Sequence, residues 1–348
     1  MQPISSIQVL RALAALMVAI HHVQPDAALL AEMAGASFQR SDLLPWMAGV
    51  DIFFVVSGFI MVHASQGLFG RPGAAGLFLR RRLARIVPLY WAATSVFLLI
   101  VLVSPSVLNS GTPSLAQIAG SYLFWPMLST QGLAQPVYSL GWTLNYEMLF
   151  YVLFAAALVL PARWTLPAVA LALAGLVVGE SLAGPLTLPF GFWGQPIVLE
   201  FAAGMGLAVL RQKGLRLHGG LRVLVGLAGV AVLMAAAHVG EGQGIWSVVA
   251  WNGSAAVLLV LAAGCGREGP VPPAPVRALA TIGDASYALY LVHPFVIRGL
   301  REVALRAGGL SPGLYILLAL GGSIVAALMI HRWFERPMTG VVRRWLGG

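Results

Sequence analysis

The chain has 348 residues, of which 59% are hydrophobic and only 9% are charged, whereas soluble domains average about 25% charged residues. A soluble protein of this size would lack the polar side chains to cover its surface. The composition therefore excludes a soluble enzyme, a disordered chain and a nucleic-acid-binding protein. The net charge of +9 fits a protein of the lipid bilayer, where an excess of Lys and Arg orients the helices.

Ten stretches are long and apolar enough to predict helices that cross a bilayer, since one crossing needs about 20 mostly apolar residues. In chain order they are 5–24, 46–65, 86–104, 139–160, 166–183, 193–210, 221–239, 246–264, 284–304 and 314–334. We therefore expect an all-α fold, a polytopic transmembrane bundle of about ten helices. Residues 1–348 are expected to form a single integral-membrane domain, because no convincing internal repeat or soluble domain interrupts the pattern.

The connections between these stretches also carry information. The longest, 105–138, is expected to form a short interfacial or re-entrant helix in its middle, 115–128. Segments 265–283 and 305–313 are rich in Gly and Pro and are expected to be loops. With the N-terminus in the cytoplasm, ten alternating helices leave 16 of the 21 Lys and Arg residues inside, so the positive-inside rule predicts two cytoplasmic termini.

Four charged residues lie within the predicted spans, at Arg11, Asp51, Glu147 and Glu200. Each would cost roughly 2.5–3.5 kcal/mol if it faced lipid, so these side chains are expected to face an interior cavity or one another. Two interpretations remain open. They form structural ion pairs between helices, or they line a polar reaction chamber or transport pathway.

The first span places two polar residues on one face. Arg11 and His22 are eleven residues apart, about three helical turns, so they are expected to lie on the same side roughly 16 Å apart. His22 is a candidate general base because imidazole titrates near neutral pH. The alternative is a buried histidine with a purely structural role. His21 is expected to point about 100° away around the helix.

The second and third spans carry two further motifs. In 49–58, GVDIFFVVSG, Asp51 opens a helix whose N-terminus favours a carboxylate, and Ser57 and Gly58 allow close backbone approach. The other interpretation of these residues is simple capping and packing. The run 78–90 is either a topogenic anchor or a site for a phosphorylated cytosolic ligand or lipid headgroup. Its basic residues are Arg80, Arg81, Arg82 and Arg85.

Two later segments add polar groups at membrane depth. In 141–151, GWTLNYEMLFY, Trp142 fits the outer aromatic belt, and Asn145 and Glu147 are too polar to face lipid cheaply. Glu147 is a candidate to orient His22, to bind a substrate hydroxyl or to pair with Arg11. The segment SYALYLVHP, 286–294, brings a second intramembrane histidine, His293.

Together these segments resemble the membrane acyltransferase 3 family, in particular its shorter exopolysaccharide and O-antigen acetyltransferase branch. Arg11 and His22 match the family's signature of an Arg, ten residues and a His. Five further blocks match in the same order, while roughly 160–270 matches only in hydropathy. These blocks are GVDIFFVVSGFIM (49–61), RRRLARIVPLYW (80–91), WTLNYEMLFY (142–151), SYALYLVHPF (286–295) and WFERP (333–337).

The resemblance implies transfer of an acyl group, most often acetyl, from cytoplasmic acyl-CoA to a hydroxyl of a glycan at the outer face. It implies His22 as the general base, with Arg11, Asp51 and Glu147 in the catalytic set. The co-substrate acyl-CoA is expected at the four arginines together with Ser57 and Gly58. The residues expected on the acceptor side are Trp142, Asn145, Tyr151 and His293.

Partners and location follow from the same resemblance. We expect a glycan or lipid-linked saccharide acceptor, contact with membrane lipids, no metal and a multi-pass protein of a bacterial-type inner membrane. A homo-oligomer or partners from polysaccharide assembly are compatible with this scheme. The competing hypotheses are a secondary transporter or glycan flippase, which explains the buried acids equally well, and a non-catalytic assembly scaffold.

Overall fold

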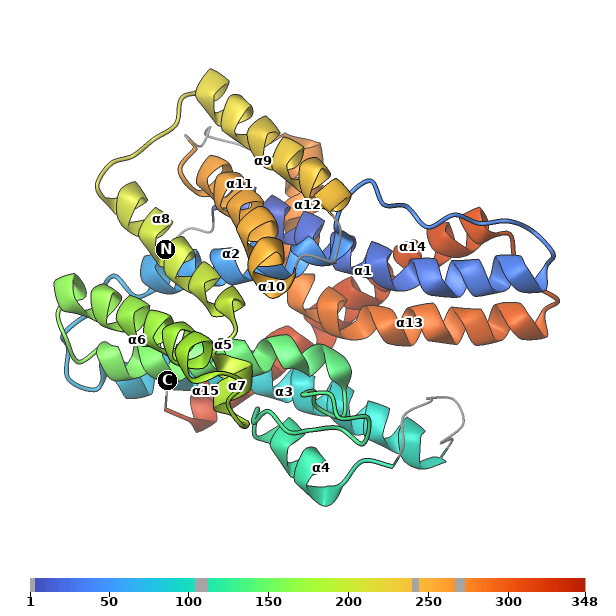
Figure 1. Ribbon diagram of the computed structural model, residues 1–348, viewed down its shortest axis with the longest axis horizontal. Helices are drawn as coiled ribbons and strands as arrows, with labels where there is room; N and C mark the ends of the chain where they lie inside the picture. Colours follow the sequence, from blue (N-terminus) through green and yellow to red (C-terminus); the bar gives the residue numbers. More distant parts are fainter. Residues whose placement is uncertain (1–3, 104–111, 240–243, 267–272, 348) are drawn as a thin grey trace. The chain divides into compact units, whose positions relative to one another are not determined.

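The computed structural model describes residues 4–103, 112–239, 244–266 and 273–347 (Figure 1). Over these residues the chain is all-helical, without named strands, which confirms the predicted fold class. Seven helical segments of the described chain are long and apolar enough to cross a membrane, so this is a multi-pass membrane protein. They are Ser5–Met33, Trp46–Ala64, Ala74–Val103, Ala162–Ala183, Gly219–Val239, Gly244–Gly264 and Pro312–Trp345.

Each of the ten predicted stretches overlaps a helix, but three of these helices do not meet the requirements of a span. Helices α5 (Trp142–Ala157) and α8 (Leu199–Gln212) have 16 and 14 residues, fewer than the roughly 20 that one crossing needs. Helix α13 (Ser286–Arg306) is long enough, but its second half is charged. The expected total of about ten spans is therefore not confirmed.

The connections were predicted with mixed success. The short helix inside 105–138 is present as α4 (Leu115–Tyr122), whose N-terminus is capped by the Ser114 side chain; residues 105–111 lie outside the described part. The segment 265–283 was expected to be a loop, and this is wrong from Ala274 onward, where α12 (Ala274–Asp284) begins. Pro near its start does not interrupt α12, because the first turn of a helix has no intrahelical partner for that N–H.

The described chain divides into two compact units, which we call unit 1 (Met1–Val62 with Ala203–Trp333) and unit 2 (His63–Ala202 with Phe334–Gly348). The prediction of a single domain stays a prediction. Each unit is described by itself below.

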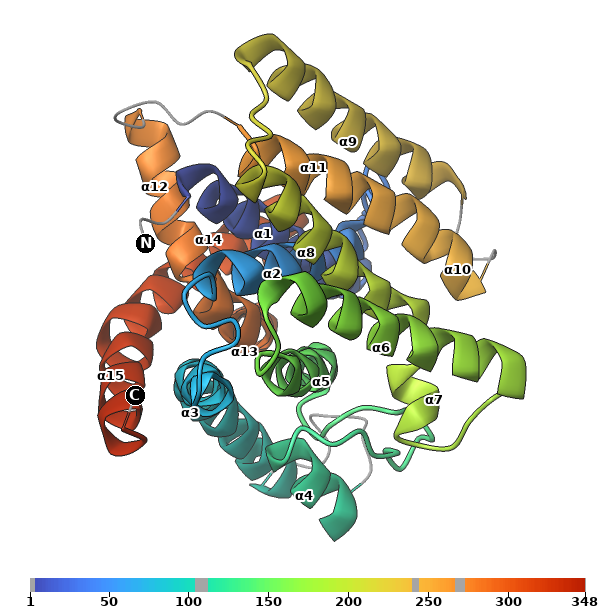
Figure 2. The same cartoon turned by 90° about the vertical axis from the view of Figure 1, so that its left-hand side faces the viewer.

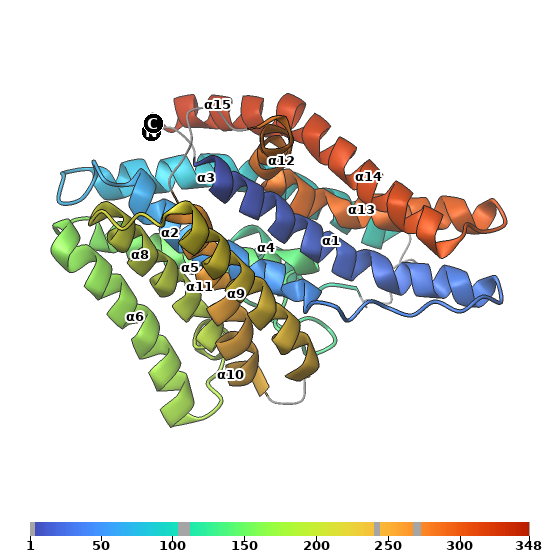
Figure 3. The ribbon, with the colours of Figure 1, turned by 90° about the horizontal axis from the view of Figure 1, so that it is seen from above.

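Unit 1 is built around α1 (Ser5–Met33), which packs against α11 (Ser254–Gly264), α12, α13 and α14 (Pro312–Ile330). Figures 1 and 3 show α1 lying along α13 and α14. The unit also contains α2 (Gly49–Ala64), α9 (Gly219–Val239) and α10 (Gly244–Val248). A Cβ added at Gly283 of α12 would meet the backbone carbonyl of Gln8, so glycine there allows α12 to touch the backbone of α1.

Unit 2 consists of α3 (Ala74–Val103), α4, α5, α6 (Ala162–Ala183), α7 (Phe190–Trp193) and α15 (Arg336–Trp345). Helix α5 packs between α3 and α6, and Figure 2 shows α3 and α5 end-on as neighbours. Aromatic rings fill this interface. The ring centroids of Phe78 on α3 and Phe154 on α5 lie 5.1 Å apart. Phe150 of α5 also stacks on Phe201 of α8, with centroids 4.5 Å apart.

Candidate functional site

Two histidines from distant parts of the sequence meet inside unit 1. His22 of α1 is half-buried, and its Nδ1 lies 2.8 Å from the Val18 carbonyl one turn earlier. His293 of α13 is fully buried, and its Nδ1 lies 3.0 Å from the Leu289 carbonyl. The Nε2 atom of His293 lies 3.4 Å from Nδ1 of His22, with the ring centroids 5.1 Å apart. The sequence singled out both residues but did not pair them.

These contacts define where the protons of the two neutral rings reside. A backbone carbonyl only accepts hydrogen bonds, so the Nδ1 atom facing it in each imidazole must carry the hydrogen. His293 then presents the lone pair of Nε2 to the Nδ1–H of His22, which it shares with the Val18 carbonyl. The remaining nitrogen of His22, Nε2, keeps its lone pair. This atom is consequently the basic position of the pair.

Arg11 lies on α1 with His22, as the sequence predicts, and is 8% exposed. Its Nη1 donates a hydrogen bond of 2.8 Å to Oε1 of Gln8, one turn earlier. Glu200, in unit 2, is 3% exposed. Both charged groups are thus enclosed by protein, as the cost of exposing a charge to lipid requires.

Helix α2 carries the next part of the predicted site in unit 1. Asp51 is in the first turn of α2 and is 4% exposed, a position where the partial positive charge of the helix N-terminus stabilises a carboxylate. Ser57 and Gly58 are also buried, about two turns further along. Asp51 and Gly58 are seven residues apart and therefore lie on one side of α2.

A second polar cluster forms in unit 2 between α3 and α5. The Tyr151 hydroxyl donates a short hydrogen bond to Oε1 of Glu147, one turn earlier on α5. The Arg82 guanidinium lies 5.5 Å from the centroid of the Phe78 ring, within the range of a cation–π interaction. Arg82 also interacts electrostatically with Tyr151 and Glu147. Two residues that the sequence assigned to different roles, Glu147 and Tyr151, are direct partners.

The four arginines of the run on α3 differ in their exposure. Arg80 and Arg81 are exposed, whereas Arg82 and Arg85 are half-buried. Residues three apart in a helix share a side, so Arg82 and Arg85 point toward the protein while their predecessors reach outward. Of the four arginines predicted to hold one ligand, two are therefore open to large solutes.

Asn145 of α5 stands out for its unsatisfied polar atoms. The residue is 1% exposed, and within the described chain neither its Nδ2 nor its Oδ1 has a hydrogen-bond partner. A buried polar group without a partner costs about 1–3 kcal/mol. Trp142, one turn earlier, packs edge-to-face on Tyr146 with centroids 5.9 Å apart. The amide of Asn145 is thus available to a bound hydroxyl or water.

Comparison with known proteins places these features in a family. The acyltransferase domain of the acyltransferase 3 family matches residues 4–332. The chain is 35% identical to the exopolysaccharide production protein ExoZ of Rhizobium meliloti, over 86% of this chain and 92% of that protein. It is 28% identical to the acyltransferase MdmB of Streptomyces mycarofaciens, over 96% of this chain and 91% of that protein. No solved structure matches the chain significantly.

The match extends over both units and includes every polar residue of the two clusters described above. The chain is helical and multi-pass, and its relatives are named as an acyltransferase and as an exopolysaccharide production protein. The chain belongs to the acyltransferase 3 family and is a membrane acyltransferase.

Proposed function

We propose that the protein transfers an acyl group, most often acetyl, from cytoplasmic acyl-CoA to a hydroxyl of a cell-surface or exported glycan. The observation that carries this proposal is the pairing of His22 with His293 inside a membrane acyltransferase. The pair leaves one basic nitrogen on a half-buried imidazole, which is what deprotonation of an alcohol requires. The name of ExoZ, an exopolysaccharide production protein, supports a saccharide acceptor.

In the proposed reaction His22 acts as general base. Its Nε2 takes the proton of the acceptor hydroxyl while the oxygen attacks the thioester carbonyl. The new C–O bond forms, the C–S bond breaks, and the leaving CoA thiolate takes up the proton from the His22 imidazolium. His293 acts as a positioning residue, since its Nε2 holds the Nδ1–H of His22. Arg11 is about three turns from His22 along α1 and its guanidinium bonds to Gln8, so it is proposed to act away from the reacting carbonyl, as part of the polar lining of α1.

The co-substrate is proposed to bind through the arginines of α3. Guanidinium groups form paired, charge-assisted hydrogen bonds with phosphates, and CoA carries phosphates on its nucleotide end. Arg80 and Arg81 are exposed and therefore suited to this contact. In unit 2, the unpartnered amide of Asn145 is proposed for the acceptor side, whereas Glu147 and Tyr151 interact with Arg82 and are proposed to act beside the CoA-binding arginines.

The proposed topology places both chain ends in the cytoplasm of a bacterial-type inner membrane. The positive-inside rule supports it, because 16 of the 21 Lys and Arg residues lie inside when the ten predicted stretches alternate across the membrane. In this arrangement acyl-CoA approaches from the cytoplasm, while a glycan or lipid-linked saccharide approaches from the other side.

A purified-protein assay tests the proposal. Wild-type protein in nanodiscs is incubated with acetyl-CoA and deacylated surface glycan; free CoA is followed with a thiol reagent and acylated glycan by mass spectrometry. We expect His22→Ala to lower the rate by about 10²–10⁴-fold, the usual contribution of a general base, with an unchanged melting temperature. His238→Ala, at an exposed histidine on α9, is the matched control and should retain activity.

Two outcomes would contradict the proposal. Transfer at the wild-type rate by His22→Ala would remove His22 from the reaction. If the wild-type protein moves glycan across the membrane of a vesicle without releasing CoA, the transporter hypothesis is favoured instead.

A further inference from the structure

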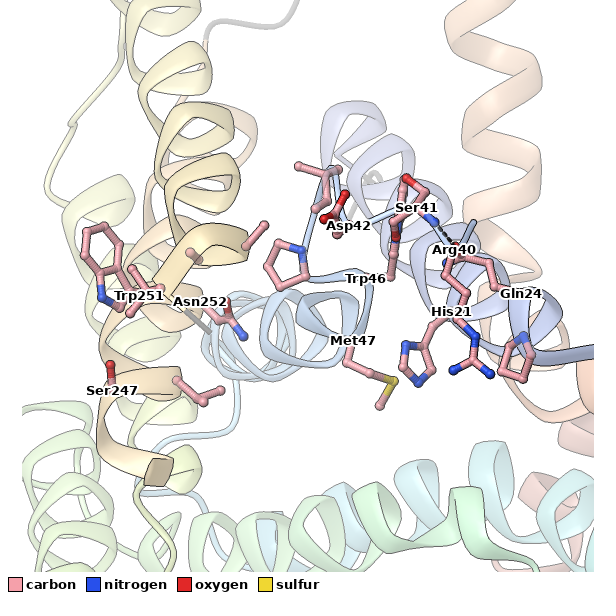
Figure 4. Close-up of a pocket in the computed structure, with 17 residues that line it drawn as sticks. His21, Gln24, Arg40, Ser41, Asp42, Trp46, Met47, Ser247, Trp251 and Asn252 are labelled. Carbon is pink, nitrogen blue, oxygen red and sulfur yellow. Dashed lines mark hydrogen bonds between the residues drawn. The ribbon is translucent and has the colours of Figure 1, made fainter. Parts of the chain in front are cut away.

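A pocket of about 540 Å³ lies in unit 1 beside His21, the neighbour of the proposed base (Figure 4). Its wall is formed by the second half of α1, the segment 40–47, the end of α9, and α10 with the turn that follows. Pockets that bind small molecules typically have volumes of about 300–1,000 Å³. The size therefore suits one or two rings of a small organic ligand, and none of the roles proposed above uses this pocket.

Hydrogen bonds hold the wall of the pocket in place. Oε1 of Gln24, on α1, accepts a bond of 2.5 Å from the backbone N–H of Ser41. The indole N–H of Trp46 donates a bond of 2.8 Å to the Ser41 carbonyl. The first bond ties the segment 40–47 to α1, and the second closes the segment on itself. The pocket is consequently preformed, which lowers the entropy cost of binding.

The opposite wall contains an irregular helical turn. Residues Val249–Gly253 form a π-helix between α10 and α11. Such turns are rare, and they occur frequently at functional sites. This one places Trp251 and Asn252 on the pocket, Asn252 being 7% exposed and Trp251 37% exposed. Figure 4 shows His21 and Met47 toward one end, with Asn252 between them and Trp251.

The lining residues indicate the class of ligand. Two tryptophans, two side-chain amides and two serines line the pocket, together with one guanidinium, Arg40, and one carboxylate, Asp42. The opposite charges of Arg40 and Asp42 cancel, so the pocket does not favour the several negative charges of CoA. A pyranose ring combines apolar C–H faces, which suit indole rings, with hydroxyls that both donate and accept hydrogen bonds, as amides do.

We propose that this pocket binds a saccharide unit of the acceptor next to the reacting hydroxyl. The inference rests on the proposed function, and it adds the place where the glycan is held. His21 connects the two, since it lines the pocket and its ring lies 5.2 Å from that of His22 in an edge-on arrangement. A saccharide in the pocket would thus be separated from the histidine pair by one side chain, that of His21.

Substitutions in the π-helical turn test the assignment. The probe is a set of oligosaccharides released from the deacylated surface polysaccharide of the source cells. Full-length protein in nanodiscs is titrated with these oligosaccharides by calorimetry, and the KM values for oligosaccharide and acetyl-CoA are measured in parallel. We expect Trp251→Leu and Asn252→Leu to weaken oligosaccharide binding and raise its KM about tenfold, with the KM for acetyl-CoA unchanged.

Two controls separate binding from folding. Trp246→Leu changes an exposed tryptophan of α10 outside the pocket lining and should bind as wild type does. Trp251→Phe keeps an aromatic face and should retain most of the affinity lost in Trp251→Leu.

The remaining outcomes distinguish failure of the pocket assignment from failure of the proposed function. If the wild type transfers acetyl groups but the pocket variants keep its affinity and KM, the pocket assignment is overturned and the proposed function stands. If the wild type binds oligosaccharide through Trp251 without releasing CoA, the pocket stands and the proposed function fails. Equal weakening by Trp246→Leu, or no binding to the wild type, overturns the pocket assignment.

Discussion

At the scale of single residues, the proposed chemistry depends on how two imidazoles share hydrogens. His22 and His293 each direct Nδ1 to a backbone carbonyl of their own helix, at 2.8 and 3.0 Å. Because both bonds are local to a helical turn, each ring orientation is set by its own helix. The contact of 3.4 Å between the rings then couples them.

The first prediction concerns His293. Replacing it with Phe removes the acceptor for the Nδ1–H of His22, while the bond to Val18 remains. One net hydrogen bond contributes about 0.5–1.5 kcal/mol, so we expect kcat to fall roughly threefold to tenfold. Stopped-flow measurement of CoA release, with KM and kcat resolved, checks this.

A conservative variant distinguishes positioning from packing. His293→Gln retains an oxygen that can accept from His22, so it should recover part of the rate lost in His293→Phe and keep the pH profile of the wild type. If Gln and Phe are equally impaired with unchanged pH profiles, the ring of His293 serves packing alone.

At the scale of elements, α1 acts as the central rod of unit 1. The first half of α1, which is proposed to lie nearer the cytoplasm, contacts α12. The second half packs against α13 and α14. Near the latter contact, Asp26 forms an ion pair of 3.1 Å with Arg301 of α13, and the Tyr315 hydroxyl of α14 donates to the Ile297 carbonyl. Polar contacts and apolar packing together fix the helix that carries His22.

The second prediction concerns the contact between α12 and α1. A Cβ at Gly283 would collide with the backbone carbonyl of Gln8, and overpacking of this kind costs about 1–3 kcal/mol. We expect Gly283→Ala to lower the melting temperature of the protein in detergent, as read by tryptophan fluorescence or differential scanning calorimetry.

Gly299 of α13 offers the matched control. A Cβ there meets nothing within 4 Å, and Ala is favoured over Gly in a helix by about 0.5–1 kcal/mol. Gly299→Ala should therefore leave the melting temperature unchanged or raise it. A melting temperature of Gly283→Ala equal to that of Gly299→Ala would show that α12 adjusts freely against α1.

At the scale of the whole molecule, the residues proposed for the chemistry are distributed over two compact units. Unit 1 contains the histidine pair and the proposed saccharide pocket, and unit 2 contains the arginine run and the Glu147–Tyr151 cluster. Both units fall within the region that matches the family. By the positive-inside rule, the distribution of Lys and Arg predicts which end of each helix faces the cytoplasm.

The third prediction tests this orientation. In a Cys265→Ala background, which removes the single native thiol, we introduce Ser41→Cys or Gln212→Cys at exposed positions. The positive-inside rule places 41 outside and 212 in the cytoplasm. An impermeant maleimide should therefore label Ser41→Cys in intact spheroplasts and Gln212→Cys only after lysis. The reverse pattern would invert the proposed topology.

The sequence predicted some of the fold and of the site well, because those features depend on local periodicity. Helices form at all ten apolar stretches, and Arg11 and His22 share α1, since hydropathy and the helical repeat act over a few turns. It misjudged 265–283 from Ala274 onward, where α12 accommodates a Pro in its first turn. It also treated four arginines as equivalent, although burial separates Arg80 and Arg81 from the other two.

The sequence by itself determined a helical membrane protein with a polar first helix, because 59% hydrophobic residues can only be accommodated with lipid as solvent. Only the tertiary structure decided which groups meet. His22 and His293 are 271 residues apart, and the pocket proposed for a saccharide draws its walls from α1, the segment 40–47, α9 and the π-helical turn. No local rule relates such residues, since their contact is set by how α1 packs against its neighbours.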